Sequence, residues 1–378
     1  MLKVLQLSVL DPVLHTRLFY KIACSLRNAG CEVSIVGTDR IKNTPETASG
    51  IRLIALPLFN RNGFTRFFRP FTLLKIAVNQ KPDVLVVHSP ELLMIAVFYK
   101  LFFWKKILVY DVLEDYRKNL KYHPFMRPWK KRLLSFAVAV WEGIWTPFFD
   151  HIWYAELCYE NSLNVPPHKI AFLLNRFTAN PLSELPKIPL PEIPYMVCTG
   201  TLNRTWGVQK TLTLWEAFNK IKPLHLIISG FTFDVEVLPE ITAFVEKSGL
   251  KDRITMVGIN EYVPYPVILH YIHSAIFGTG LYDLPPSIQG KIPTKFYEFL
   301  ALQKPLLFTD DNYWNTLNET WNFGISIRPE DSPETIWKKL QQFKPDAPKP
   351  EIYSWEENED KIIRKIVETW KKTKENER

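Results

Sequence analysis

Residues 287–309 read SIQGKIPTKFYEFLALQKPLLFT, and the fold can be worked out from this stretch. It opens as a polar loop that contains Gly290, and Pro293 suits the first position of a helix because proline lacks the N–H that a helix start leaves unpaired. Apolar residues recur at helical spacing over 294–302, and 306–308 has the pattern of a short buried strand. A loop that leads into a helix start beside a strand can bind an anion, because free backbone N–H groups point toward it.

The same alternation of short apolar runs and amphipathic segments extends over the whole chain. It predicts an α/β protein whose strands form parallel sheets. Strands are expected at 4–9, 32–36, 50–56, 84–87, 107–110, 150–155, 170–174, 195–199, 225–229, 254–257, 275–278, 306–308 and 324–327. Helices are expected at 16–29, 60–78, 92–103, 127–149, from 208 onward, and at 236–248, 265–272, 294–302, 332–343 and 355–371.

The length of 378 residues suits two domains rather than one. Five prolines fall within residues 181–194, a composition that favours extended chain, so we place a linker there. The predicted domains are therefore 1–180 and 195–350. The segment 351–378 is expected to add a final helix that crosses back to the first domain.

Charge is distributed unevenly along the chain. Residues 1–180 carry 24 Lys and Arg against 13 Asp and Glu, whereas the rest carries 23 against 26. A basic first half favours an anionic partner for that half, although a merely basic surface is the alternative. Neither a signal peptide nor a metal-type cysteine spacing is expected. Buried, reduced thiols are predicted for Cys24, Cys31, Cys158 and Cys198.

The run PTKFYEFLALQKP at 293–305 resembles the donor-sugar signature of family 4 glycosyltransferases, of the kind found in bacterial polysaccharide and lipopolysaccharide biosynthesis. The resemblance implies the GT-B fold, with two Rossmann-like, doubly wound parallel-sheet domains that face each other across a cleft. It also implies a metal-independent hexosyl transfer with retention at the anomeric carbon, from a nucleotide diphosphate sugar and without a cofactor. Glu298 stands where the family holds the ribose hydroxyls. From the residues alone, an ordinary βα unit with an exposed Lys295–Glu298 pair is the alternative.

The loop 200–207 resembles the first phosphate loop of this family. Gly200 and Gly207 match the family pattern, whereas Trp206 stands at its basic position, so the charge opposite the diphosphate must come from other cations. The donor-binding candidates are Gly200, Thr201, Arg204, Lys210, Gly230, Lys291, Pro293, Thr294, Lys295 and Glu298. The catalytic candidates are Arg204, Lys295 and Glu114.

Polar residues at the carboxyl ends of the first-half strands are the acceptor-side candidates, because ligands bind at that edge of open α/β sheets. They are His15, Arg17, His88, Glu114 and Asp115. Leu113 and Gly290 stand where many relatives carry a histidine and a glutamate. These departures keep two other functions open: a catalytically weak GT-B subunit that binds a glycan or nucleotide, and a nucleotide-sugar epimerase.

Segments 61–75 and 127–149 combine Lys and Arg with large apolar side chains. The apolar run in the second is shorter than the roughly 20 residues of a spanning helix. We therefore expect these segments to lie on an anionic membrane surface, with an interior helix as the alternative for 127–149. The expected partners are a nucleotide sugar, a glycan or lipid-linked acceptor, and this membrane surface, but no nucleic acid. The expected location is the cytoplasm, peripherally on the inner face of the plasma membrane.

Overall fold

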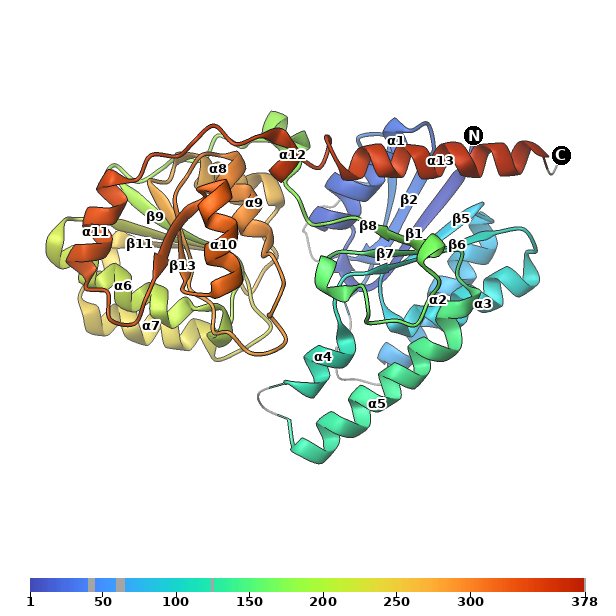
Figure 1. The fold of residues 1–378 in the computed structure, drawn as a ribbon, viewed down its shortest axis with the longest axis horizontal. Coiled ribbons are helices and arrows are strands. Elements are labelled where there is room, and N and C mark those ends of the chain that lie inside the picture. The colour runs from blue at the N-terminus through green and yellow to red at the C-terminus, as the bar shows by residue number, and fades with distance from the viewer. Residues whose placement is uncertain (40–44, 59–64, 124–125, 377–378) are drawn as a thin grey trace. The chain divides into compact units, whose positions relative to one another are not determined.

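The computed structural model describes residues 1–39, 45–58, 65–123 and 126–376, which form two compact units (Figure 1). The first unit comprises Met1–Asn175, Pro285–Lys291 and Trp355–Arg378, and the second comprises Arg176–Leu284 and Ile292–Ser354. The expected linker 181–194 thus belongs to the second unit. Residues 60–64 of the expected helix 60–78, Arg61 among them, lie outside the described residues.

Within the described residues, the sheet of the first unit has eight strands in the order β3-β4-β2-β1-β5-β6-β7-β8, all pairing in parallel except β3 with β4. The strands are β1 (Lys3–Pro12), β2 (Glu32–Thr38), β3 (Thr47–Ala48), β4 (Ile51–Leu56), β5 (Val84–Val87), β6 (Ile107–Val112), β7 (His151–Tyr154) and β8 (Ile170–Phe172). Central strands are apolar on both faces: every residue of β5 is buried. Such runs form where helices cover both faces of a parallel sheet.

Helices connect these strands, and the chain's last helix packs on the same unit (Figure 1). They are a π-helical segment (Thr16–Ala23) continued by α1 (Cys24–Asn28), then α2 (Thr65–Gln80), α3 (Leu93–Phe102), α4 (Tyr116–Lys121), α5 (Pro128–Trp145) and α13 (Glu359–Asn376). The return of the chain is fixed at buried Trp355, whose indole Nε1 donates to Ser25 Oγ over 2.9 Å. Lys371 Nζ donates to the Ala29 carbonyl at the end of α1 over 2.7 Å.

The second unit contains a parallel sheet of six strands among the described residues, in the order β11-β10-β9-β12-β13-β14. Its strands are β9 (Tyr195–Thr201), β10 (His225–Phe231), β11 (Ile254–Ile259), β12 (Phe277–Gly280), β13 (Leu306–Thr309) and β14 (Gly324–Ile327). Its helices are α6 (Val208–Ile221), α7 (Val237–Ser248), α8 (Tyr265–Ser274), α9 (Thr294–Ala301), α10 (Asn312–Trp321), α11 (Pro333–Gln342) and α12 (Pro350–Tyr353). The prediction of an α/β protein with two parallel-sheet domains is confirmed.

Several elements differ from the sequence-based expectation, and two of these differences have a clear local reason. Strand β12 begins two residues late because α8 continues to Ser274, and the N–H of Ala275 still bonds to the Tyr271 carbonyl. The second difference is α10, because no helix was predicted after Asp311. The Asp311 carboxylate accepts from the Trp314 N–H over 3.0 Å and so caps α10.

Helix α5 is mostly exposed, with Glu142 as its one buried residue. The alternative of an interior helix over 127–149 is therefore wrong. No helix in the described part of the chain is long and apolar enough to cross a membrane.

The buried carboxyl of Glu142 should make stability depend on pH. Burial raises the pKa of Glu142 to about 7, while the Tyr110 hydroxyl, which donates to it over 2.9 Å, acts in the opposite direction. In the unfolded chain the carboxyl ionises near its usual value, so the folded state loses stability as pH rises from about 4.5 to about 7. Glu142→Gln, which keeps an acceptor for Tyr110, should therefore stabilise the first unit at pH 8 by about 1–3 kcal/mol and have little effect at pH 4.

Urea unfolding at the two pH values measures this difference. Glu368→Gln on the exposed face of α13 makes the same change of net charge and serves as the control. An equal effect of Glu142→Gln at both pH values would contradict a titrating carboxyl at this position.

Candidate functional site

The candidate site lies at the carboxyl edge of the second sheet, beside β9 and β12. The chain leaves β9 toward β10 on one side and later returns to β12 on the other. Open α/β sheets bind ligands outside such a switch point, because the loops after the two strands diverge there. Helix α6 follows β9, and α9 follows β12.

Glycine lets the two loops at this edge approach closely. Gly207 has φ +84° at the start of α6, and a Cβ on it would lie 2.1 Å from the Leu281 carbonyl oxygen. The Asp283 N–H also donates to the Thr205 carbonyl over 2.7 Å. The loop 200–207 and the loop after β12 therefore pack against each other.

The predicted donor glycines hold the end of β9 beside β10. Gly200 has φ +90° and pairs in register with Gly230. A Cβ on Gly230 would lie 1.9 Å from the Gly200 carbonyl oxygen, so this approach requires glycine. Thr201, the last residue of β9, is exposed at the same edge.

Lys295 stands out at this edge because its charged side chain is buried. Its side chain is 8% exposed in the first turn of α9, just after Pro293 and Thr294. Its Nζ lies 3.4 Å from the Thr279 carbonyl oxygen and 5.1 Å from the centre of the Tyr282 ring. Among the described residues, no ion pair joins it to a carboxylate.

The surroundings of Lys295 favour its charged form. Burial lowers the pKa of Lys295, but Tyr282, Cys198 and Glu298 raise it, and the net shift is upward. Glu298 is itself buried and follows Lys295 by three residues on α9. A buried ammonium at a helix start is suited to bind an anion, since the helix N–H groups add to its charge.

The other predicted donor cations of the second unit pair with carboxylates. Arg204 Nη2 lies 2.6 Å from Glu240 Oε1, and Lys210 Nζ lies 2.7 Å from Asp283 Oδ1. Both cations are 40–50% exposed. An anion that binds Arg204 or Lys210 at this edge must therefore displace the carboxylate that is paired with it.

Lys291 packs in the first unit instead. Its Nζ lies 2.8 Å from Glu114 Oε2 and 5.5 Å from the centre of the Tyr159 ring. Asn119 also donates to Glu114 over 2.9 Å, and the neighbouring Asp115 caps α4 by accepting from the Lys118 N–H. Lys291, a predicted donor-binding residue, and Glu114, a predicted catalytic residue, thus form an ion pair with each other.

A buried polar network lies at the switch point of the first sheet, beside β1 and β5. It connects the predicted residues Arg17 and His88 with Asp111 and Gln6. Arg17 donates through Nε and Nη2 to both oxygens of Asp111, the shorter distance being 2.6 Å. His88 Nδ1 lies 2.9 Å from Asp111, and its Nε2 lies 3.0 Å from Gln6. Arg17, His88 and Asp111 are at most 2% exposed.

The charge of Asp111 is stabilised by this network. Burial raises its pKa, but the Arg17 guanidinium and the hydrogen bond from His88 outweigh burial and lower it to about 2. Asp111 was not among the predicted site residues. The signal that could have found it is an acidic residue at the carboxyl end of an apolar strand, where ligands bind.

His15 differs from these residues because its Nδ1 is buried with no hydrogen-bond partner among the described residues. It follows β1 at the switch point, and burial lowers its pKa against the opposing effect of Asp11. A neutral imidazole with an unused nitrogen can donate to or accept from a hydroxyl group.

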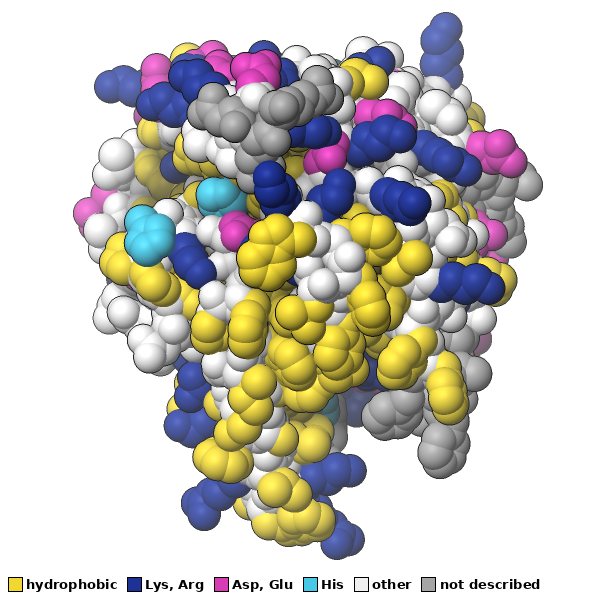
Figure 2. Space-filling view, turned by 90° about the vertical axis from the view of Figure 1, so that its right-hand side faces the viewer, with side chains coloured by type: hydrophobic (Ala, Val, Ile, Leu, Met, Phe, Trp, Pro, Cys, Tyr) yellow, Lys and Arg dark blue, Asp and Glu magenta, His cyan; other side chains and the backbone are white. Residues whose placement is uncertain are grey.

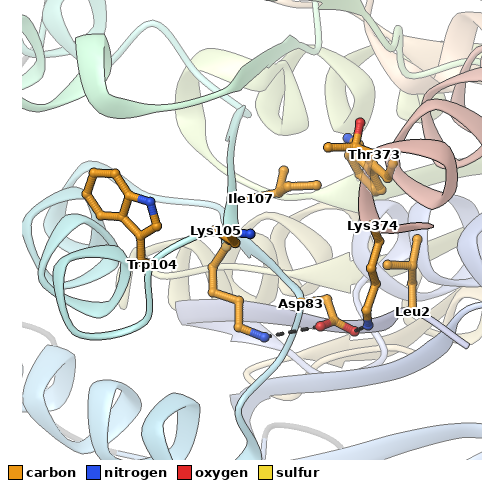
Figure 3. A pocket seen from close by; sticks show the side chains of 9 residues that line it. Leu2, Asp83, Trp104, Lys105, Ile107, Thr373 and Lys374 are labelled. Atoms are coloured by element: carbon orange, nitrogen blue, oxygen red, sulfur yellow. Dashed lines mark hydrogen bonds and ion pairs between the residues drawn. The ribbon is translucent and has the colours of Figure 1, made fainter. Parts of the chain in front are cut away.

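A pocket of about 240 Å³ lies at the opposite, amino-terminal edge of the first sheet (Figure 3). Asp83, just before β5, accepts there from Lys106 over 3.1 Å and from Lys374 of α13. Two of the three lysines that line the pocket are thus paired within the unit, and we do not regard the pocket as the site. No group of three or more His, Cys, Asp or Glu side chains that could hold a metal ion occurs in the described ranges.

No family model matches the chain, and no curated protein matches it significantly. Solved structures do. A sucrose-phosphate synthase from Thermosynechococcus elongatus matches with a TM-score of 0.67 and 13% identity over 100% of both chains. A trehalose-6-phosphate protein from E. coli, bound with UDP-2-fluoro glucose, matches with 0.56 and 12% over 90% of this chain and 91% of the other. A UDP-GlcNAc 2-epimerase from Methanocaldococcus jannaschii matches with 0.57 and 14% over 97% and 99%.

These similarities establish the class of fold. The chain has the two-domain GT-B fold, as the sequence resemblance implied. At 11–15% identity the similarity concerns the fold alone.

Proposed function

We propose that the protein is a glycosyltransferase that uses a nucleotide diphosphate sugar as donor. The observation that carries this proposal is the buried Lys295 ammonium at the start of α9, beside the loop 200–207. A structural neighbour is described as bound with UDP-2-fluoro glucose, which supports this ligand class.

In the proposed complex the diphosphate lies against the start of α9 and the loop 200–207. Lys295 neutralises charge that develops on the leaving diphosphate as the bond to the anomeric carbon breaks. Arg204 and Lys210 exchange their carboxylate partners for phosphate oxygens, since both pairs are half exposed and hence weak. Glu298 accepts hydrogen bonds from the ribose hydroxyls.

The acceptor is proposed to be lipid-linked or a polysaccharide, as in bacterial polysaccharide or lipopolysaccharide biosynthesis, at the inner face of the plasma membrane. The unused Nδ1 of His15 is the best-placed acceptor-side group, because Arg17 and His88 are occupied in the buried network. Glu114 and Asp115 remain acceptor-side candidates. The transfer is proposed to be metal-independent and to retain the anomeric configuration by front-face attack, as the resemblance to family 4 glycosyltransferases implies.

Calorimetric titration with UDP-, GDP-, ADP- and dTDP-sugars tests donor binding first. We expect one donor to bind and the others to bind at least tenfold more weakly, because a pocket that hydrogen-bonds one base leaves polar groups unpaired with another. Transfer to a lipid-linked acceptor extract, followed by NMR of the product, should then show the donor's own anomeric configuration. No binding by any nucleotide sugar would contradict the proposal.

An epimerase is the second candidate, and the similarity to a UDP-GlcNAc 2-epimerase supports it. The same titration separates the two functions. An epimerase converts its nucleotide sugar without acceptor, and the epimer is visible by NMR. A binding subunit leaves the nucleotide sugar unchanged whether or not acceptor is present.

A further inference from the structure

Helix α5 carries a second apolar stripe that faces solvent. Trp141 and Trp145 on one side pack against the rest of the unit, and Trp145 contacts Phe98 of α3 at 6.0 Å between ring centres. On the other side, positions at helical spacing are exposed: Trp129, Leu133, Phe136, Val140 and Ile144. A surface helix normally presents polar residues there.

The end of α3 extends this exposed apolar surface. Leu101 and Phe102 in its last turn are 64% and 77% exposed, and Trp104 just after it is 79% exposed. Phe68 and Phe71 of α2, which packs against α3, are exposed as well. We call this surface of α2, α3 and α5 the apolar face. Figure 2 shows hydrophobic side chains gathered on it, with Lys and Arg at its margins.

The charges on the apolar face have one sign. The sequences of α2, α3 and α5 contain a single acidic residue, Glu142, which is buried. Lys75, Lys130 and Arg132 are exposed on α2 and α5. Lys105 and Lys106 follow α3, and Lys105 is exposed. A continuous apolar surface edged by cations complements an anionic bilayer, where cations meet head groups and aromatic side chains enter the interface.

A second copy of the chain fits this face poorly. A two-fold dimer places the same surface on both sides of the interface, so Lys130 and Arg132 would approach cations with no exposed acid on α2, α3 or α5 to pair with. Apolar surface of this extent is rare on proteins that bind nothing there.

We propose that the apolar face docks on an anionic phospholipid bilayer, with the end of α3 and the outer stripe of α5 in the interface. This deepens the proposed function, because it states which surface meets the membrane that holds the acceptor. It extends the sequence-based expectation for 61–75 and 127–149 by the end of α3, and it does not depend on the donor chemistry.

Co-sedimentation with phosphatidylcholine vesicles, with and without phosphatidylglycerol, tests the proposal. The chain should bind only the anionic vesicles and leave them at high salt. Lys130→Glu, Lys131→Glu and Arg132→Glu together should lower partitioning by at least about a hundredfold, since each lost cation contributes roughly fivefold and each new carboxylate is repelled by the anionic surface. The control Lys220→Glu, Lys222→Glu and Lys247→Glu makes the same charge change in the second unit and should bind as the parent does.

A second variant tests insertion separately from charge. Leu101→Ser, Phe102→Ser and Trp104→Ser together remove exposed side chains and should lower partitioning about tenfold or more. Phe233→Ser with Val235→Ser, exposed in the second unit, is the matched control. No binding by the parent, or equal losses in variants and controls, would overturn the proposal. So would a dimer in analytical ultracentrifugation that the serine variant makes monomeric.

Donor titration of the same variants keeps the two proposals distinct. Both face variants should bind the nucleotide sugar as the parent does. Vesicle binding without donor binding would remove the transferase function and leave the docking surface. Donor binding without vesicle binding would remove the docking surface and leave the transferase function.

Discussion

Replacing Asp111 by asparagine is expected to destabilise the first unit by about 3–5 kcal/mol. Asparagine keeps the size of the side chain but removes the charge that balances the Arg17 guanidinium, which is 2% exposed. A buried cation without a counter-ion costs far more than the loss of one hydrogen bond. Hydrogen exchange by mass spectrometry measures the effect, with peptides from β1 and β6 reporting on the first unit and peptides from β9 on the second.

Two comparisons show whether buried charge is the cause. Glu357→Gln breaks the exposed pair with Lys361 and should change stability by less than about 1 kcal/mol. Arg17→Met added to Asp111→Leu removes both charges and should recover part of the loss, because no charge then remains unpaired. The effect of Asp111→Asn should also shrink as pH falls from about 4 toward 2, since the lowered pKa of Asp111 stabilises the fold only above that range. A small effect at pH 7 would contradict the network's role.

The sheets could be predicted because their strands carry a strong local signal. The run Val84–Val87 contains only valine and leucine, and such a short run, rich in β-branched residues, is typical of a central parallel strand. The helix start at 293–294 was predicted from proline and the following apolar spacing, and α9 begins at Thr294. These features depend on neighbouring residues, which a sequence shows directly.

Contacts between distant residues could not be predicted in the same way. Arg17 and Asp111 are 94 positions apart, and no local sequence pattern predicts that they form a hydrogen bond in the interior. Lys291 is close to α9 in sequence and was therefore grouped with the donor residues, yet it pairs with Glu114, 177 positions away. Side-chain partners follow from the order of the strands, which the sequence restricts but does not specify.

The solvent exposure of the end of α3 could not be predicted from the sequence either. Its sequence, LMIAVFYKLF, is apolar apart from Lys100 and is typical of a largely buried helix. Only the neighbours of a helix decide which of its sides is covered, and here α2 and α5 leave Leu101 and Phe102 in solvent. The basic and aromatic composition of 127–149 pointed to a surface helix, because buried helices rarely carry adjacent unpaired cations.

Lys295→Met is expected to lower the turnover of the nucleotide sugar about a thousandfold, because removing one preorganised donor from a leaving-group site costs about 100- to 1,000-fold. Methionine keeps the length of the stem that packs on Gly280 and Tyr282. The folded chain should be as stable as the parent or more so, since the change removes a buried charge whose Nζ lies as far as 3.4 Å from the Thr279 carbonyl oxygen. Single-turnover kinetics and thermal unfolding, measured together, separate the two effects.

Glu298→Gln is the companion variant, and it should act on binding instead of turnover. It keeps the shape of a buried side chain on the same helix but loses the charge-assisted bonds to the ribose, each about 1.5–3 kcal/mol. Calorimetry should show donor affinity at least tenfold weaker with turnover of bound donor nearly unchanged. Lys220→Met, on an exposed position of α6, controls for loss of a lysine in the second unit. Parental turnover in Lys295→Met would refute the assignment of the diphosphate to the start of α9, whatever Glu298→Gln does.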